Sequence, residues 1–108
     1  MLKIEAYIRP TSLPAFQAAL VGAGVKGVTV WQTKGIGHEY HESNKREVFR
    51  GSEVEEVYIY RVRLDAVIED SEKDAVIEAL TTVAEEGDLG TLKIFVTPVL
   101  DAIRVPKT

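Results

Sequence analysis

The chain has 108 residues, of which 45% are hydrophobic and 28% charged, as expected for one globular domain over residues 1–108. Its formal net charge is −4 and no cluster of Lys or Arg stands out, which argues against nucleic acid as the main partner. The absence of cysteine excludes disulfides and thiolate sites, and the lack of a signal-peptide pattern or of an apolar run near roughly 18 residues predicts a cytoplasmic protein without membrane insertion.

The first part of the chain predicts a strand, a helix and a second strand. Residues 2–9 alternate apolar with polar side chains, which is typical of a half-buried strand. A helix follows, with its N-cap at Thr11 or Ser12 and its stop at Gly22 or Gly24. A second strand is expected at about 26–33.

A long loop is expected next, over residues 34–56. From Lys34 to Glu53 it carries glycines, charged residues, His, Tyr and Asn, and almost no aliphatic side chains, so it cannot bury itself. Loops of this length are uncommon in compact domains and usually functional, although a surface loop without a duty is the alternative.

The second part of the chain predicts another strand, helix and strand. Residues 57–65 alternate again, and the helix at about 72–86 has one apolar face. Ser71 and Asp74 form its expected capping box, and Gly87 is expected to end it in the left-handed conformation. A last strand starts at Lys93, and residues 99–108 form a C-terminal tail.

This order of elements predicts an α+β fold. Two β-α-β units give a four-stranded antiparallel sheet covered on one face by two helices, the ferredoxin-like arrangement. The other face has no helix to cover it and would carry aromatic and aliphatic residues, either Tyr58 and Tyr60 or Tyr7, Trp31 and Ile59. Exposed patches of that kind usually mark an interface, so a homo-oligomer is expected.

The residues also bear on two other classes of function, metal binding and catalysis. His38 and His41 lie three positions apart beside Glu39 and Glu42, a spacing that fits a metal such as zinc. For catalysis, the paired carboxylates Glu55-Glu56 and Glu85-Glu86 do not converge on a substrate, and no nucleophile motif or zinc-protease motif is present. An enzyme is not expected.

Several segments resemble, in order and spacing, the PII signalling proteins of nitrogen regulation. They are IEAYIRP, GVKGVTVWQTKGIG, FRGSE, DAVIEAL and KIFVTPVLDAIR. The resemblance implies a homotrimer of ferredoxin-like subunits that binds ATP or ADP, with Mg²⁺ as a companion, in clefts between subunits, and needs no cofactor to fold. It also implies that the long T-loop, here 34–56, docks through residues 38–54 onto a membrane transporter or a metabolic enzyme and reports the nucleotide and 2-oxoglutarate state.

The resemblance also implies a nucleotide site. Gly35 and Gly37 stand at the base of the T-loop, and residues 87–92 form the loop on the phosphate side. The implied nucleotide-binding residues are Thr29, Gly35, Gly37, His38, Gly87, Gly90, Lys93 and Arg104.

This sequence departs from the family pattern at that site. A basic residue is replaced by His38 and a tail arginine by Pro106, and the phosphate loop has Asp88 for a lysine and Leu92 for a glycine. Fewer cations and an added carboxylate predict weaker phosphate affinity.

The implied effector and modification positions differ too. Glu39 replaces a glutamine that helps hold the effector, Arg61 replaces a lysine that pairs its far carboxylate, and Val54 replaces the modified tyrosine. Weak or absent 2-oxoglutarate binding is therefore expected. The alternative function is a PII-like regulator that responds to a metal, through His38 and His41, or to a small anion.

Overall fold

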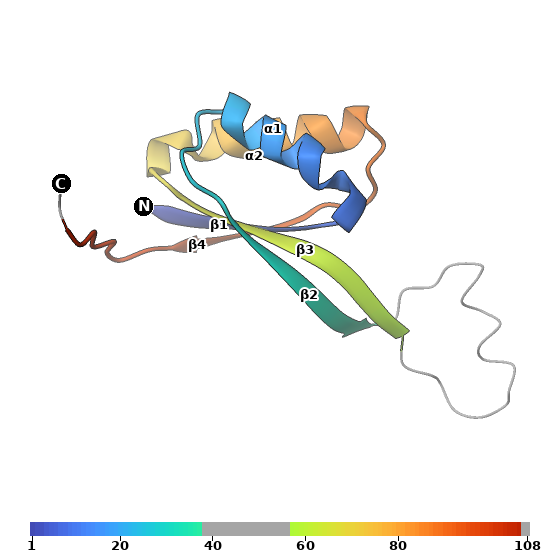
Figure 1. Ribbon diagram of the computed structural model, residues 1–108. Coiled ribbons are helices and arrows are strands. Elements are labelled where there is room, and N and C mark those ends of the chain that lie inside the picture. Colours follow the sequence, from blue (N-terminus) through green and yellow to red (C-terminus); the bar gives the residue numbers. More distant parts are fainter. Residues whose placement is uncertain (38–56, 107–108) are drawn as a thin grey trace, which may run out of the picture.

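The computed structural model describes residues 1–37 and 57–106, and these form two layers, a sheet and a pair of helices (Figure 1). The strands pair antiparallel in the order β2-β3-β1-β4. The elements in chain order are β1 (Leu2–Ile8), the 3₁₀ turn η1 (Pro10–Ser12), α1 (Leu13–Gly22), β2 (Thr29–Gly37), β3 (Val57–Ile68), the 3₁₀ turn η3 (Asp70–Glu72), α2 (Lys73–Glu86) and β4 (Lys93–Pro98). The predicted ferredoxin-like α+β fold is confirmed.

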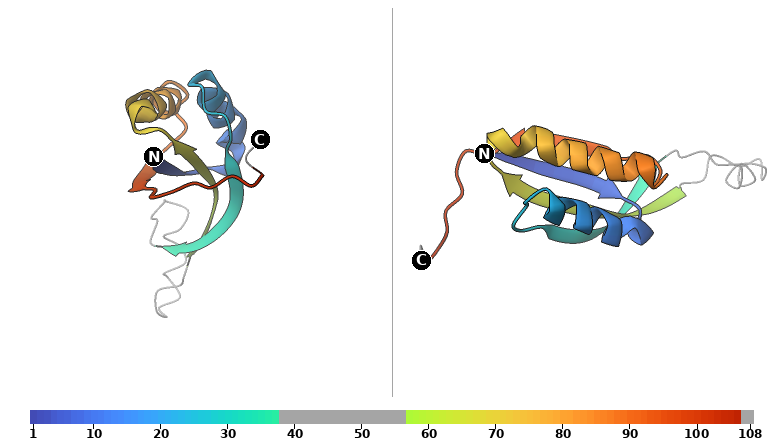
Figure 2. Two further views of the ribbon diagram at one scale, coloured as in Figure 1. Left: turned by 90° about the vertical axis from the view of Figure 1, so that its left-hand side faces the viewer. Right: turned by 90° about the horizontal axis from the view of Figure 1, so that it is seen from above.

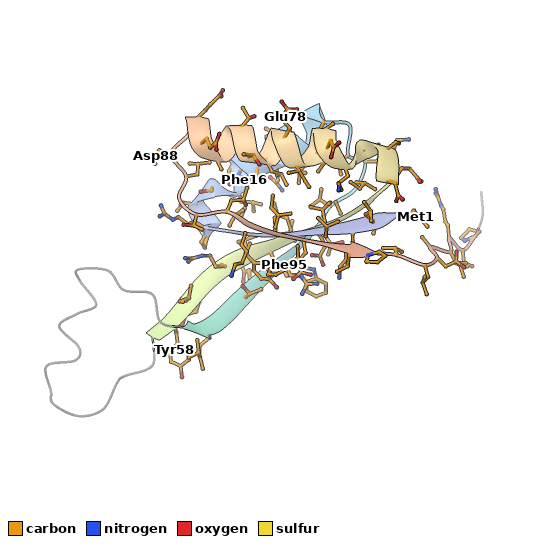
Figure 3. The ribbon with its side chains drawn as sticks, turned by 180° about the vertical axis from the view of Figure 1, so that it is seen from behind. Met1, Phe16, Tyr58, Glu78, Asp88 and Phe95 are labelled. Atoms are coloured by element: carbon orange, nitrogen blue, oxygen red, sulfur yellow. The ribbon has the colours of Figure 1, made fainter. Side chains whose placement is uncertain are left out.

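The core lies between the sheet and the two helices, which run side by side over one face (Figure 2). Phe16 of α1 points into it, whereas Phe95 of β4 lies on the far side of the sheet (Figure 3). The buried members are every second residue of β1 and β3 and one stripe of each helix, because side chains alternate along a strand and recur every three to four positions in a helix. They are Ile4, Ala6, Ile8, Phe16, Leu20, Val62, Leu64, Ala66, Ile68, Val76, Leu80 and Ala84.

The β2–β3 hairpin extends past the helices (Figure 1). Tyr58 and Tyr60 continue the face that buries Val62 and Leu64, yet their side chains are 50% and 58% exposed because no helix lies over that part of the sheet. The predicted second strand, 26–33, is therefore wrong at both ends, since β2 runs from Thr29 to Gly37. The cross-strand partners that β3 offers up to Val57 extend β2 into residues expected in the loop.

The caps at the helix starts also differ from the prediction. Ser12 lies in η1, has helical backbone angles and makes no side-chain cap, because the chain enters α1 through a 3₁₀ turn. The capping box of the second helical segment is formed by Glu69 and Glu72, not by Ser71 and Asp74. The Glu69 backbone N–H donates to Glu72 Oε1 at 2.8 Å at the start of η3, which the sequence pattern did not separate from α2.

Both helices end in the same hydrogen-bonded motif, with one residue in the left-handed conformation. After α1 that residue is Gly24 (φ 89°), where the Val25 N–H donates to Leu20 O at 3.0 Å. After α2 it is Asp88 (φ 51°), where the Leu89 N–H donates to Ala84 O at 3.0 Å. The prediction for Gly87 is wrong, because Gly87 has φ −89° and the next residue takes the left-handed position.

The face of the sheet opposite the helices carries a polar and aromatic network. Arg63 donates from Nε and Nη2 to the two carboxylate oxygens of Asp65, both at 2.9 Å, and Trp31 Nε1 donates to the same carboxylate at 3.1 Å. The Tyr7 hydroxyl donates to Glu5 at 2.6 Å, and its ring meets the edge of Phe95 at a centroid distance of 6.1 Å. Among the described residues no helix covers this face, and none is long and apolar enough to cross a membrane.

Candidate functional site

The predicted nucleotide-binding residues that fall within the described ranges divide between two ends of the molecule. Gly35 and Gly37 of β2 and the loop 87–92 lie toward the end where the hairpin projects, and Lys93 follows that loop at the start of β4 (Figure 1). Arg104 lies in the tail, which leaves the opposite end of β4 and points away from the body (Figure 1).

The two cations expected to bind phosphate are therefore far apart within one chain. Lys93 is the first residue of β4, and Arg104 lies beyond its last residue, Pro98. The strand alone separates its two ends by roughly 17 Å at ~3.3 Å per residue. Thr29 is separated from Lys93 across the sheet, perpendicular to the strands, because β2 and β4 form its two edges. Three strand spacings of ~4.8 Å place these edges roughly 14 Å apart. A single chain does not bring these groups to one small molecule.

The loop between α2 and β4 is held by its backbone conformation. Gly90 has φ +87°, a conformation that favours glycine. A Cβ at Gly87 would lie 3.0 Å from Leu89 Cγ and 3.1 Å from the Val83 carbonyl oxygen, so close packing rather than a positive φ explains this glycine. Both predicted loop glycines therefore have a structural reason in this chain.

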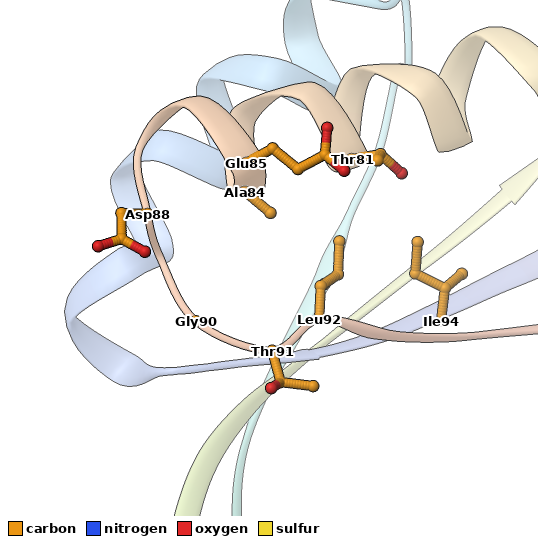
Figure 4. Close-up of a pocket in the computed structure, with 8 residues that line it drawn as sticks. All are labelled: Thr81, Ala84, Glu85, Asp88, Gly90, Thr91, Leu92 and Ile94. Carbon is orange, nitrogen blue, oxygen red and sulfur yellow. The ribbon is translucent and has the colours of Figure 1, made fainter.

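A cavity of about 460 Å³ lies on the helix side of this loop (Figure 4). Leu92 and Ile94 point from the strand side toward α2, whereas Asp88 and Thr91 point outward from the loop (Figure 4). The charged residues in its lining are Glu85 and Asp88, both carboxylates, which disfavours an anion there. A phosphate would instead be expected on the opposite side of the loop, toward the open face.

The open face beside the loop is basic. The alternation of side chains puts Tyr7 and Lys93 on that face, where they are cross-strand partners. The Lys93 ammonium lies 6.0 Å from the centroid of the Phe95 ring. Arg9 follows directly after β1, and its guanidinium lies against Gly90. The sequence alternation had placed Arg9 on this face but gave no sign of its contact with the loop.

Thr29 begins β2 opposite Asp65 of β3. Burial raises the pKa of Asp65, but the hydrogen bonds and charge of Arg63, with the hydrogen bond from Trp31, lower it below its ordinary value. The hydrogen bond to Asp65 likewise raises the pKa of Arg63. Thr29 is therefore exposed beside a carboxylate that stays ionised and is already satisfied.

The predicted effector position Arg61 lies on β3, where its Nη1 donates to the Tyr60 carbonyl oxygen at 3.0 Å. Its own carbonyl oxygen accepts from the Thr33 hydroxyl at 3.0 Å. His38, Glu39 and His41 lie outside the described residues, so the metal site and the weak binding of 2-oxoglutarate stay predictions. Residues 1–37 and 57–106 contain no group of three or more His, Cys, Asp or Glu that could hold a metal ion.

Comparison with known proteins gives one consistent result. A family profile described as "Nitrogen regulatory protein P-II" matches residues 1–108. A protein of that name from Azospirillum brasilense is 39% identical over 105 residues, which cover 97% of this chain and 91% of that protein. Those from Microchaete diplosiphon and Nostoc punctiforme are each 35% identical with the same coverage.

Proposed function

The chain belongs to the nitrogen regulatory protein P-II family, and from that premise we propose that it binds ATP or ADP between the subunits of a homotrimer and regulates a partner through its long loop. It is a signal-transduction protein rather than an enzyme. The finer parts of the proposal are the nucleotide with its Mg²⁺, the trimer, and a transporter or metabolic enzyme bound through residues 38–54 in the cytoplasm.

One observation carries the nucleotide proposal. The predicted phosphate ligand Lys93 begins β4, Arg104 lies beyond its other end, and Thr29 lies at the other edge of the sheet. These residues serve one ligand only if different subunits contribute them. A cleft between two subunits satisfies this condition, because in a closed ring one end of each subunit meets the other end of its neighbour.

The exposed tail supports the same arrangement. Leu100, Ile103 and Val105 are 99%, 77% and 84% exposed in the single chain, although apolar side chains gain from burial. The open face of the sheet adds the rings of Trp31 and Phe95, which are 51% and 45% exposed. An oligomer that covers both surfaces would bury apolar area that the single chain leaves in water.

Subunit mixing tests the shared site. Lys93→Ala and Arg104→Ala should each weaken ATP binding by about 1.5–3 kcal/mol, the usual loss for a charge-assisted hydrogen bond. Suppose that each cleft takes Lys93 from one subunit and Arg104 from its neighbour. In randomly mixed trimers about one cleft in four then receives both unmutated residues, because each of the two positions is filled by the right variant half of the time.

Isothermal titration of each variant alone and of the refolded mixture measures this recovery, and light scattering checks that all three samples are trimers. A mixture that binds ATP no better than either variant would show that Lys93 and Arg104 do not share a cleft across subunits. A wild-type monomer at micromolar concentration would remove the basis of the proposal altogether.

A further inference from the structure

Arg9 occupies an unusual place beside the loop 87–92. An ideal Cβ built on Gly90 would lie 2.6 Å from Arg9 Nη2, 2.7 Å from Cζ and 2.9 Å from Nε. All three guanidinium atoms lie close to that position, so the guanidinium fills the space beside Gly90 that a side chain there would occupy. The φ of +87° favours glycine at position 90, and a Cβ there would push the end of the flexible Arg9 side chain away.

The Arg9 guanidinium is placed but not neutralised. Within residues 1–37 and 57–106 it makes no hydrogen bond and no ion pair, and the residue is exposed. The contact with Gly90 restricts its position without using any of its five N–H donors. A guanidinium held in this way presents its fork of donors to a ligand at a reduced cost in side-chain entropy.

The charges around Arg9 favour an anion. Lys93 of β4 is the cross-strand partner of Tyr7 in β1, so both side chains lie on the open face. Arg9 is two residues after Tyr7 in the chain. Ile8 pairs with Val62, so the next position along β3 from the end of β1 is Arg61. Glu85 and Asp88 line the cavity on the helix side of the loop (Figure 4), and Glu5 on the open face accepts a hydrogen bond from Tyr7 and lies 3.6 Å from Arg63.

We propose that Arg9 binds the phosphates of the nucleotide, together with Lys93, on the open side of the loop 87–92. The inference rests on the proposed nucleotide function and adds a residue to its site. Arg9 lies within IEAYIRP, one of the segments that carry the resemblance, and with Asp88 in the loop its guanidinium is one of the cations left beside the phosphates. Arg9 pairs with phosphate oxygens in a bidentate manner, which an ammonium at the same place would not reproduce.

The first test replaces Arg9 by glutamine, which keeps much of the side-chain length and removes the charge. ATP affinity should fall about 10-fold to 100-fold, as for the loss of a hydrogen bond to a charged group, while adenosine, which has no phosphate, should bind as before. Lys73→Gln is the matched control, since Lys73 is an exposed cation at the start of α2 and its loss should leave both ligands unaffected. Unchanged urea midpoints would show that the variants are folded.

The second test moves the guanidinium without mutating it. In Gly90→Ala the new Cβ displaces the Arg9 side chain, so ATP affinity should fall by a similar factor. Gly24→Ala is its control, because Gly24 has nearly the same φ, +89°, and nothing within 4 Å of an added Cβ. Both variants suffer the same backbone strain, and only the Gly90 variant should lose ATP affinity.

Tripolyphosphate separates the two levels of the proposal. If the wild-type protein binds ATP and Arg9→Gln binds it equally well, the role of Arg9 is refuted while the nucleotide function stands. If the wild-type protein binds tripolyphosphate in an Arg9-dependent way but shows no preference for ATP, the anion site stands and the nucleotide function fails. Absence of binding of either probe to the wild-type protein would overturn both.

Discussion

Replacing Asp88 by glycine should stabilise the protein. Asp88 occupies the left-handed position at the end of α2, with φ 51° and its N–H donating to Glu85 O at 3.3 Å. An L-residue in this conformation costs roughly 1–2 kcal/mol, and aspartate somewhat less because its short polar side chain tolerates it. Glycine avoids that cost but loses roughly 0.5–1 kcal/mol more chain entropy on folding, so a net gain of about 0.5 kcal/mol in the free energy of unfolding is expected.

The chain contains its own reference for this prediction. Gly24 occupies the equivalent position after α1, with φ 89° and the same pair of backbone hydrogen bonds. Gly24→Asp should therefore destabilise the protein by about as much as Asp88→Gly stabilises it. Asp88→Asn separates charge from conformation, because asparagine tolerates the left-handed region and should leave stability nearly unchanged.

Urea unfolding followed by the single tryptophan, at one fixed protein concentration, measures all three variants. The concentration is fixed because an oligomer's stability depends on it. The reasoning is refuted if Asp88→Gly is no more stable than the wild-type protein, or if Asp88→Asn gains as much as Asp88→Gly. The second result would mean that the charge of the Asp88 carboxylate, not the φ of this residue, destabilises the protein.

Three further predictions concern the core and the ion pairs. Leu80→Ala should lower the free energy of unfolding by about 2–5 kcal/mol in urea titrations, since Leu80 is 1% exposed. The folded-state pKa of Asp65 is lowered, so ionised Asp65 should stabilise the protein above its ordinary pKa of 3.8. That contribution should be lost as the pH falls through the lower folded-state pKa, and Trp31 fluorescence should change at the same pH, but not in Asp65→Asn. The Met1 amine pairs with Asp70 at 2.9 Å, and the hydrogen bond to Asp70 raises the pKa of the amine. The stabilisation from this pair should be complete below pH 8.0 and lost as the pH rises through the higher folded-state pKa. Urea titrations of Asp70→Asn should show no such loss.

The alternation and helical spacing were enough to predict the layers of the fold. Ile4, Ala6 and Ile8 are buried as the period of two requires, and Val76, Leu80 and Ala84 form the stripe of α2 that the helical period requires. These patterns succeed because burial against one neighbouring layer is a regular function of position along the element.

The ends of the elements could not be predicted in the same way. Lys34 to Gly37 contain two glycines and a lysine and were expected in the loop, but their partners on β3 continue the ladder and make them strand. The left-handed residue after α2 is Asp88 rather than the adjacent glycine, a choice set by which carbonyls the last N–H groups can reach. Such outcomes depend on residues that only the fold brings together.

Prediction of the candidate site from sequence met the same difficulty. Lys93 and the loop glycines could be assigned from the resemblance, whereas Arg9 could not, because its relation to Gly90 joins the end of β1 to the loop before β4. A pattern of residues that are close in sequence cannot predict a contact between positions 9 and 90. Arg9 was visible in sequence only as the last polar residue of an alternating strand.

The projecting hairpin separates the long connection from the folded core in evolutionary terms. None of the buried core residues of the described chain lies in Thr29–Gly37, and those of β3 begin at Val62. The connection between Gly37 and Val57 starts and ends beyond the reach of the helices, and lengthening such a connection is inexpensive, about 0.6 kcal/mol for each doubling. A lineage can therefore rewrite or lengthen that stretch while selection on the packed body continues undisturbed.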